Sequence, residues 1–176
     1  MTMRDLASAV GMEAASLYNH IKSKEDILKE ICFSLGETYS QNMSQVISSN
    51  SPLIEKLEAL ITLHIKINFQ SSSLASVLND EWRHLNEEDK KHFLDQRHQY
   101  EDNFIHVIKE GIEVGVIRNL EPRIVLYTIL SSMRWLFHWY YLDRPFEYDQ
   151  VKETISEMIF KSILTSEARD KILIGS

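Results

Sequence analysis

The chain has 176 residues, 44% of them hydrophobic, with only five glycines and three prolines, and a formal net charge of −7. This length suits one or two small domains around one substantial core, and the hydrophobic periodicity is mostly helical, so we expect an all-α fold. The negative charge argues against a generally basic nucleic-acid-binding protein. The single cysteine excludes an intramolecular disulfide, and no segment has the pattern of a signal peptide, so we expect a cytoplasmic location.

The first 47 residues predict three helices. Residues 1–7 predict a short one, with Thr2 as its cap and Asp5 three positions later. Residues 11–28 read GMEAASLYNHIKSKEDIL, in which a glycine turn leads to a second helix over residues 13–21. Ser23, with an acid at the third helical position, then predicts the start of a long helix that reaches residue 46 or 47.

This run resembles the end of the helix-turn-helix in tetracycline-repressor (TetR) family regulators. The glycine turn, the Leu17-Tyr18 pair, His20 and the Lys24-Glu25-Asp26 triplet all fall at the family's spacing. The resemblance implies a ligand-responsive, DNA-binding transcription regulator, most often a repressor, with residues 1–47 as the DNA-binding region and its connecting helix. In the family a further helix precedes this motif. We therefore expect either a start upstream of Met1 or a shortened homologue that no longer binds DNA.

The same resemblance implies which side chains would contact operator DNA. Recognition helices present their first turns to base edges and flanking phosphates. The residues at these positions are Glu13, Ala14, Ser16, Tyr18, Asn19, His20 and, as a phosphate contact, Lys24. The alternative for the apolar members of this helix is that they form only the core of a small helical unit.

After the Ser/Pro-rich boundary at residues 48–52, residues 51–176 are expected to form a second, helical region. The helices predicted there cover about residues 53–70, 74–85, 87–114, 122–142 and 149–163, with Asn86 as the cap of the third. This order also resembles the TetR ligand-binding domain, in which the last two long helices usually pair with those of a second subunit. A homodimer is therefore implied.

The most apolar helix predicts a ligand cavity. Its less hydrophobic residues form one stripe that includes Tyr127, Arg134 and His138. A buried arginine is costly unless it is paired or bound to an anion. We therefore expect Arg134 either to hold the anionic part of a ligand or to pair with an acid on another helix. The full set of expected ligand contacts is Trp82, Tyr100, Phe104, Tyr127, Arg134, Trp135 and His138. The aromatic end of this helix is similar to family members that sense acyl-CoA thioesters.

Other chemistry is weakly indicated. His64, alone on an apolar helix face, predicts a hydrogen-bonded core histidine. Acid–histidine pairs such as Asp80/His84 could gather a cation, but solvated helix faces explain them better. No local signature of a catalytic triad or a phosphate-binding loop occurs, so neither an enzyme nor a cofactor is expected. The apolar helix carries Arg134 and His138 near its middle, which argues against a membrane span.

Overall fold

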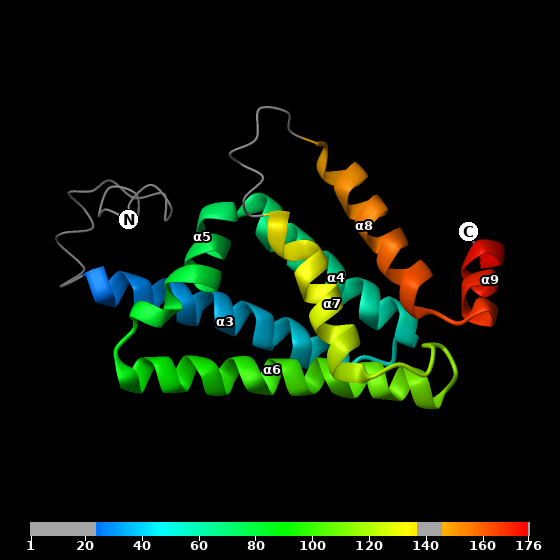
Figure 1. Ribbon diagram of the computed structural model, residues 1–176, viewed down its shortest axis with the longest axis horizontal. Helices are drawn as coiled ribbons and strands as arrows, with labels where there is room; N and C mark the ends of the chain where they lie inside the picture. The colour runs from blue at the N-terminus through cyan, green and yellow to red at the C-terminus, as the bar shows by residue number, and fades with distance from the viewer. Residues whose placement is uncertain (1–23, 137–145, 176) are drawn as a thin grey trace.

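The computed structural model describes residues 24–136 and 146–175, and nearly all of this part of the chain is helical (Figure 1). The predicted all-α fold is confirmed. None of the described helices combines the length and apolar character needed to cross a membrane. The elements are α3 (Lys24–Ser48), α4 (Leu53–Gln70), α5 (Ser72–Ser76), the π-helix η1 (Val77–Glu81), the 3₁₀-helix η2 (Trp82–His84), α6 (Glu87–Glu113), α7 (Pro122–Arg134), α8 (Tyr148–Ile163) and α9 (Ser166–Gly175).

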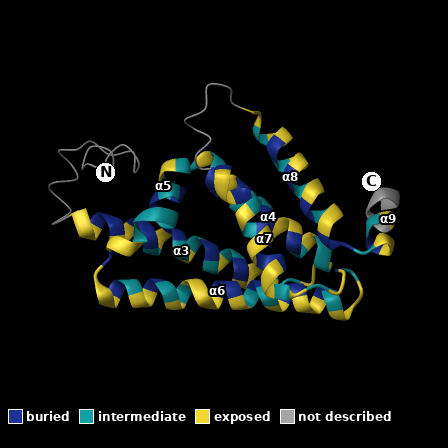
Figure 2. Ribbon diagram, viewed as in Figure 1, coloured by how far each residue is buried: buried dark blue, intermediate teal, exposed yellow. Residues whose placement is uncertain are grey.

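The two longest helices, α3 and α6, lie side by side, with α4 and α7 crossing over them (Figure 1). Helix α3 buries the face that its periodicity predicts, which includes Ile31, Leu35 and Met43. Helix α4 supplies the centre of the core, because Leu57 and Leu60 have no accessible surface. Figure 2 shows these buried faces turned towards one another while the outer faces of α3 and α6 remain exposed.

The start of α6 is fixed by the cap that the sequence predicts. Asn86 Oδ1 accepts a hydrogen bond from the Asp89 backbone N–H (2.9 Å), and the Asn86 amide donates to Asp89 Oδ2 (2.8 Å). The other oxygen of Asp89 forms an ion pair with Lys29 of α3 (2.7 Å). This hydrogen-bonded ion pair lowers the pKa of the Asp89 carboxyl, so the Asp89 side chain both holds the Asn86 cap in place and ties α6 to α3.

Two predicted helices differ from the structure. The helix expected over residues 74–85 is divided into α5, η1 and η2. Within it the Asn79 amide donates to the Ala75 carbonyl (2.7 Å), and such side-chain bonds compete with regular main-chain pairing. The α-helix expected to reach residue 142 ends at Arg134, where the Ser132 hydroxyl bonds back to the Ile129 carbonyl (2.7 Å). Residues 137–145 lie outside the described part of the chain.

The turn between α6 and α7 is bonded to the end of α8. Gly115 has φ of +76°, a left-handed conformation that favours glycine. Beside it, the Arg118 N–H donates to the Ile163 carbonyl (2.8 Å) and the Thr165 hydroxyl donates to the Gly115 carbonyl (2.9 Å). These bonds anchor the end of α8 beside the start of α7, two helices that pack against each other.

Candidate functional site

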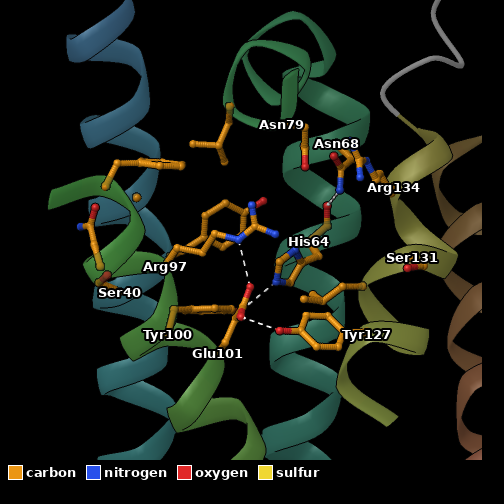
Figure 3. Close-up of a pocket in the computed structure, with 16 residues that line it drawn as sticks. Ser40, His64, Asn68, Asn79, Arg97, Tyr100, Glu101, Tyr127, Ser131 and Arg134 are labelled. Carbon is orange, nitrogen blue, oxygen red and sulfur yellow. Dashed lines mark hydrogen bonds and ion pairs between the residues drawn. The ribbon is translucent and has the colours of Figure 1, made fainter. Parts of the chain in front are cut away.

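A cavity of about 220 Å³ lies among α3, α4, η1, α6 and α7 (Figure 3). Apolar atoms make up most of its wall, and the polar atoms are concentrated on a few side chains. The lining residues are Gly36, Tyr39, Ser40, His64, Asn68, Leu78, Asn79, Phe93, Gln96, Arg97, Tyr100, Glu101, Tyr127, Leu130, Ser131 and Arg134. A partly apolar cavity with a few convergent polar groups is the usual form of a small-molecule site.

Three rings in mutual contact line one part of the cavity. The rings of His64 and Tyr39 stack with centroids 4.6 Å apart, and Tyr100 meets both edge-on. A hydrogen bond joins His64 Nε2 to the Tyr100 hydroxyl oxygen (2.8 Å). The hydrogen bond predicted for His64 is therefore present, but the ring also lines the cavity, which the sequence reading did not favour.

Burial fixes the protonation states of these rings. His64 is half-buried and lines the cavity. Burial lowers the pKa of His64 to about 4 and raises the pKa values of Tyr39 and Tyr100. All three side chains are therefore neutral at pH 7, and they offer a ligand hydrogen-bonding groups and ring faces rather than charge.

Next to Tyr100 on α6 the cavity is lined by a buried carboxylate, Glu101, which is 8% exposed. One of its oxygens accepts from Arg97 Nε and the other from the Tyr127 hydroxyl, both at 2.9 Å (Figure 3). The hydrogen bond to Glu101 raises the pKa of the Tyr127 hydroxyl. Sequence reasoning missed Glu101, although its spacing from Arg97 (i,i+4) and from Phe104 (i,i+3) would place it on the buried face.

Arg134 lines the cavity and also pairs with an acid on another helix, which was one of the two alternatives; that it holds the anion of a ligand stays a prediction. Its Nη2 lies 3.2 Å from Asp80 Oδ1 of η1. The expectation that Arg134 is buried is wrong, because 55% of its side-chain surface is exposed. Helix α7 ends at this residue, so the guanidinium lies near the end of a helix and not in the middle of a buried one.

The other expected ligand contacts divide into two groups. Tyr100 and Tyr127 line the cavity with Arg134, whereas Trp82, Phe104 and Trp135 do not. Phe104 is wholly buried in the core, and Trp82 packs on the Phe93 ring with centroids 5.8 Å apart. Trp135, just beyond the end of α7, is 42% exposed. His138 lies outside the described residues.

Of the residues expected to contact DNA, the structure describes one. Lys24 is the first residue of α3, and its side chain is exposed. Glu13, Ala14, Ser16, Tyr18, Asn19 and His20 precede the described part of the chain. In that part, no group of three or more histidine, cysteine, aspartate or glutamate side chains could hold a metal ion.

Residues 50–163 match the sequence model described as "Tetracyclin repressor-like, C-terminal domain", and residues 1–31 match that of "Bacterial regulatory proteins, tetR family". The chain belongs to the TetR family. The resemblance found in residues 11–28 is thereby confirmed, and the chain is a DNA-binding transcriptional regulator of that family.

Named relatives agree with this family. The HTH-type transcriptional repressor KstR2 of Mycolicibacterium smegmatis is 22% identical, over 94% of this chain and 82% of its own length. The structure of the ketosteroid transcriptional regulator KstR2 of Mycobacterium tuberculosis has a TM-score of 0.79 at 22% identity, covering 94% of this chain and 86% of that one. AibR in complex with isovaleryl coenzyme A and operator DNA has a TM-score of 0.72 at 22% identity, covering 91% and 87%. Both structures show the shared fold.

The low pKa of His64 predicts how stability depends on pH. The folded chain binds fewer protons than the unfolded chain below about pH 6.5, so stability falls as pH drops towards about 4, by at most about 3 kcal/mol. Urea unfolding between pH 7 and pH 4.5 measures this loss. His64→Gln should flatten the profile. Tyr100→Phe, which removes the hydrogen-bond partner but leaves the histidine buried, should keep it. A steep profile in His64→Gln would assign the dependence to other groups.

Proposed function

We propose that this chain is a cytoplasmic repressor that leaves its operator when a small molecule with an apolar body and an anionic group fills the cavity. The observation that carries the proposal is the cavity itself, whose apolar and aromatic walls end at Arg134. An arginine at the rim of an apolar cavity suits a ligand whose charged end stays near solvent, because the charge need not be fully desolvated.

An acyl-CoA thioester is the ligand class that we favour. A volume of about 220 Å³ suits a small acyl group, with the phosphate-bearing part of the molecule left outside near Arg134. The fold shared with AibR, whose structure holds isovaleryl coenzyme A, supports testing this class first. Tyr127 and Tyr100 would contact the acyl part from α7 and α6.

We propose that residues 1–47 form the DNA-binding region and that residues 51–176 bind the ligand and the second subunit. In the first region Glu13, Ala14, Ser16, Tyr18, Asn19 and His20 would face the groove, and Lys24 would contact phosphate. Helix α3 belongs to both functions, because it begins at Lys24 and reaches the cavity at Gly36 and Tyr39. A ligand that shifts α3 would change the position of the DNA-contacting residues that precede it.

The partner is a second copy of the chain, paired through α7 and α8. Large apolar side chains are exposed on both helices: Ile124 is 66% exposed on α7 and Met158 is 68% exposed on α8. Exposed apolar residues gathered on adjacent helices suit an isologous interface. In such a dimer the spacing between the two DNA-binding regions must match DNA half-sites about one helical turn apart. A small rotation of one subunit against the other therefore lowers the affinity for operator.

Lys24→Ala should weaken binding to DNA from the chain's own promoter region and reduce the slope of log K against log[salt] by about 1, because one phosphate contact is lost. Fluorescence anisotropy at several salt concentrations measures both values. Lys66→Ala, which removes an exposed lysine from α4, is the matched control and should leave the slope unchanged. If the parent chain shows no sequence-preferring binding, the alternative applies: a shortened homologue that binds a small molecule or a partner subunit.

Isovaleryl-CoA and longer acyl-CoA thioesters should release the chain from its DNA in a concentration-dependent way. Arg134→Ala should raise the concentration needed by about tenfold or more, since a charge-assisted contact to an anion is lost. The same anisotropy assay measures the release. Arg123→Ala removes an exposed arginine from the start of the same helix and should behave as the parent does. An equal rise in the required ligand concentration for both variants would mean that positive charge in general, and not the cavity rim, attracts the ligand.

Met158→Asp should weaken the dimer at least about tenfold, because a carboxylate would have to be desolvated in an apolar interface. Sedimentation velocity over a concentration series measures the dissociation constant. Ile47→Asp is the matched control, because Ile47 is also exposed (40%) but lies on α3. Dissociation caused by Ile47→Asp and not by Met158→Asp would place the interface elsewhere.

A further inference from the structure

We propose that Asp80 competes with the anionic group of the ligand for Arg134, and that this carboxylate therefore sets the preference of the cavity for anionic over neutral ligands. The inference rests on the proposed function, in which Arg134 receives the ligand's anion. It adds a residue that opposes binding to the residues that promote it.

The geometry places Asp80 where the ligand's anion would bind. Arg134 ends α7 at the cavity, and Asp80 approaches it from η1 with its Oδ1 at 3.2 Å from Arg134 Nη2. The two residues before Asp80, Leu78 and Asn79, line the cavity themselves. Figure 3 shows Arg134 near Asn68 and Asn79 at the same end of the cavity. An anion that entered here would meet the guanidinium and the carboxylate together.

The two cavity arginines differ in how firmly they are paired. Arg97 is bound at 2.9 Å by Glu101, whose side chain is only 10% exposed and whose second oxygen is held by Tyr127. Releasing Arg97 would leave a buried carboxylate without its cation, which is costly. The Asp80 side chain is 39% exposed and is bonded to Arg134 through one guanidinium nitrogen. Water can solvate the released carboxylate, so Arg134 is the arginine that can exchange partners.

The backbone around Asp80 also suits exchange. η1 is a π-helical turn between α5 and η2, and π-helical turns are frequent at functional sites. The same segment packs against α3. Displacing Asp80 from Arg134 would therefore free a segment that touches both the cavity and the helix leading towards the DNA-binding region.

The test compares two probes that share their ring systems and differ in charge: 1-anilinonaphthalene-8-sulfonate, an anion, and N-phenyl-1-naphthylamine, which is neutral. Fluorescence titration gives a dissociation constant for each probe. Asp80→Asn should bind the anionic probe about 3- to 5-fold more tightly, the range expected when an exposed ion pair is removed. Its affinity for the neutral probe should stay the same. Glu81→Gln makes the same charge change one residue away and should alter neither affinity.

Two further variants test the cause. Asp80→Glu keeps the charge and should retain the parent's preference. In the Arg134→Ala background, adding Asp80→Asn should tighten the anionic probe by less than it does in the parent, because the competition needs both partners. An undiminished gain in that background, no change in Asp80→Asn, or equal tightening of both probes would overturn the proposal.

The same data separate this inference from the proposed function. If Arg134→Ala weakens the anionic probe while Asp80→Asn changes nothing, Arg134 holds the anion without competition and only the role of Asp80 is wrong. If Arg134→Ala leaves the anionic probe unaffected, or neither probe binds the parent, the proposed ligand class fails and the role of Asp80 fails with it. Thermal melting of every variant confirms that affinities are compared between folded proteins.

Discussion

The burial of one carboxylate, Glu101, constrains the centre of this structure. A charge in that position must be neutralised and hydrogen-bonded, and Arg97 and Tyr127 satisfy its two oxygens. The first bond lies within α6 and the second crosses to α7, so the carboxylate fixes the relation of these helices. The cavity lies where the apolar core of α3, α4 and α6 gives way to this network.

Among the described residues, the formal charges around the cavity sum to zero, but its two ion pairs differ in how far their carboxylates are exposed. Arg97 with Glu101, and Arg134 with Asp80, give two cations and two carboxylates, while burial keeps His64 neutral. The deeper pair is held by protein contacts, and the outer pair is shared with solvent. Under the proposed function, electrostatic selectivity would therefore reside at the rim, where breaking an ion pair is cheap. The interior would discriminate between ligands by shape and by hydrogen bonds to neutral groups.

Sequence reasoning predicted what depends on neighbouring residues in the chain. The Asn86 cap and the buried face of α3 follow from spacing over a few positions, and both are present. The division of residues 72–84 and the early end of α7 were not predicted, because periodicity places apolar faces but does not report a π-helical turn or the end of a helix that lacks a strong stop signal. Glu101 was missed for a related reason. Its role depends on Tyr127, 26 residues away, and no local pattern encodes that contact.

Arg134 illustrates the limit more sharply. Its position in a very apolar segment indicated either a ligand contact or an ion pair. The structure has an ion pair on the cavity wall. A fully buried arginine could satisfy only one of these alternatives. An arginine at a helix end, half in solvent, can exchange one partner for the other. The degree of burial therefore changes the chemistry, and burial at a helix end is what a periodic pattern specifies least.

Helix α3 connects the cavity to Lys24, the first residue of the helix. From Lys24 to Tyr39 is 15 residues, or about 22 Å of helix at 1.5 Å per residue. Near the cavity the helix lies close against α6, since a Cβ on Gly36 would stand 2.4 Å from Gln96 Oε1. Nearer its start, the Lys29–Asp89 ion pair holds it to the beginning of α6. Breaking that ion pair would leave the Asp89 carboxylate, which is 8% exposed, without its cation, so it is costly in the same way as releasing Glu101 from Arg97. Both contacts therefore hold α3 against α6 on the stretch that joins Lys24 to the cavity, and a movement of α3 at Tyr39 would have to carry or break them.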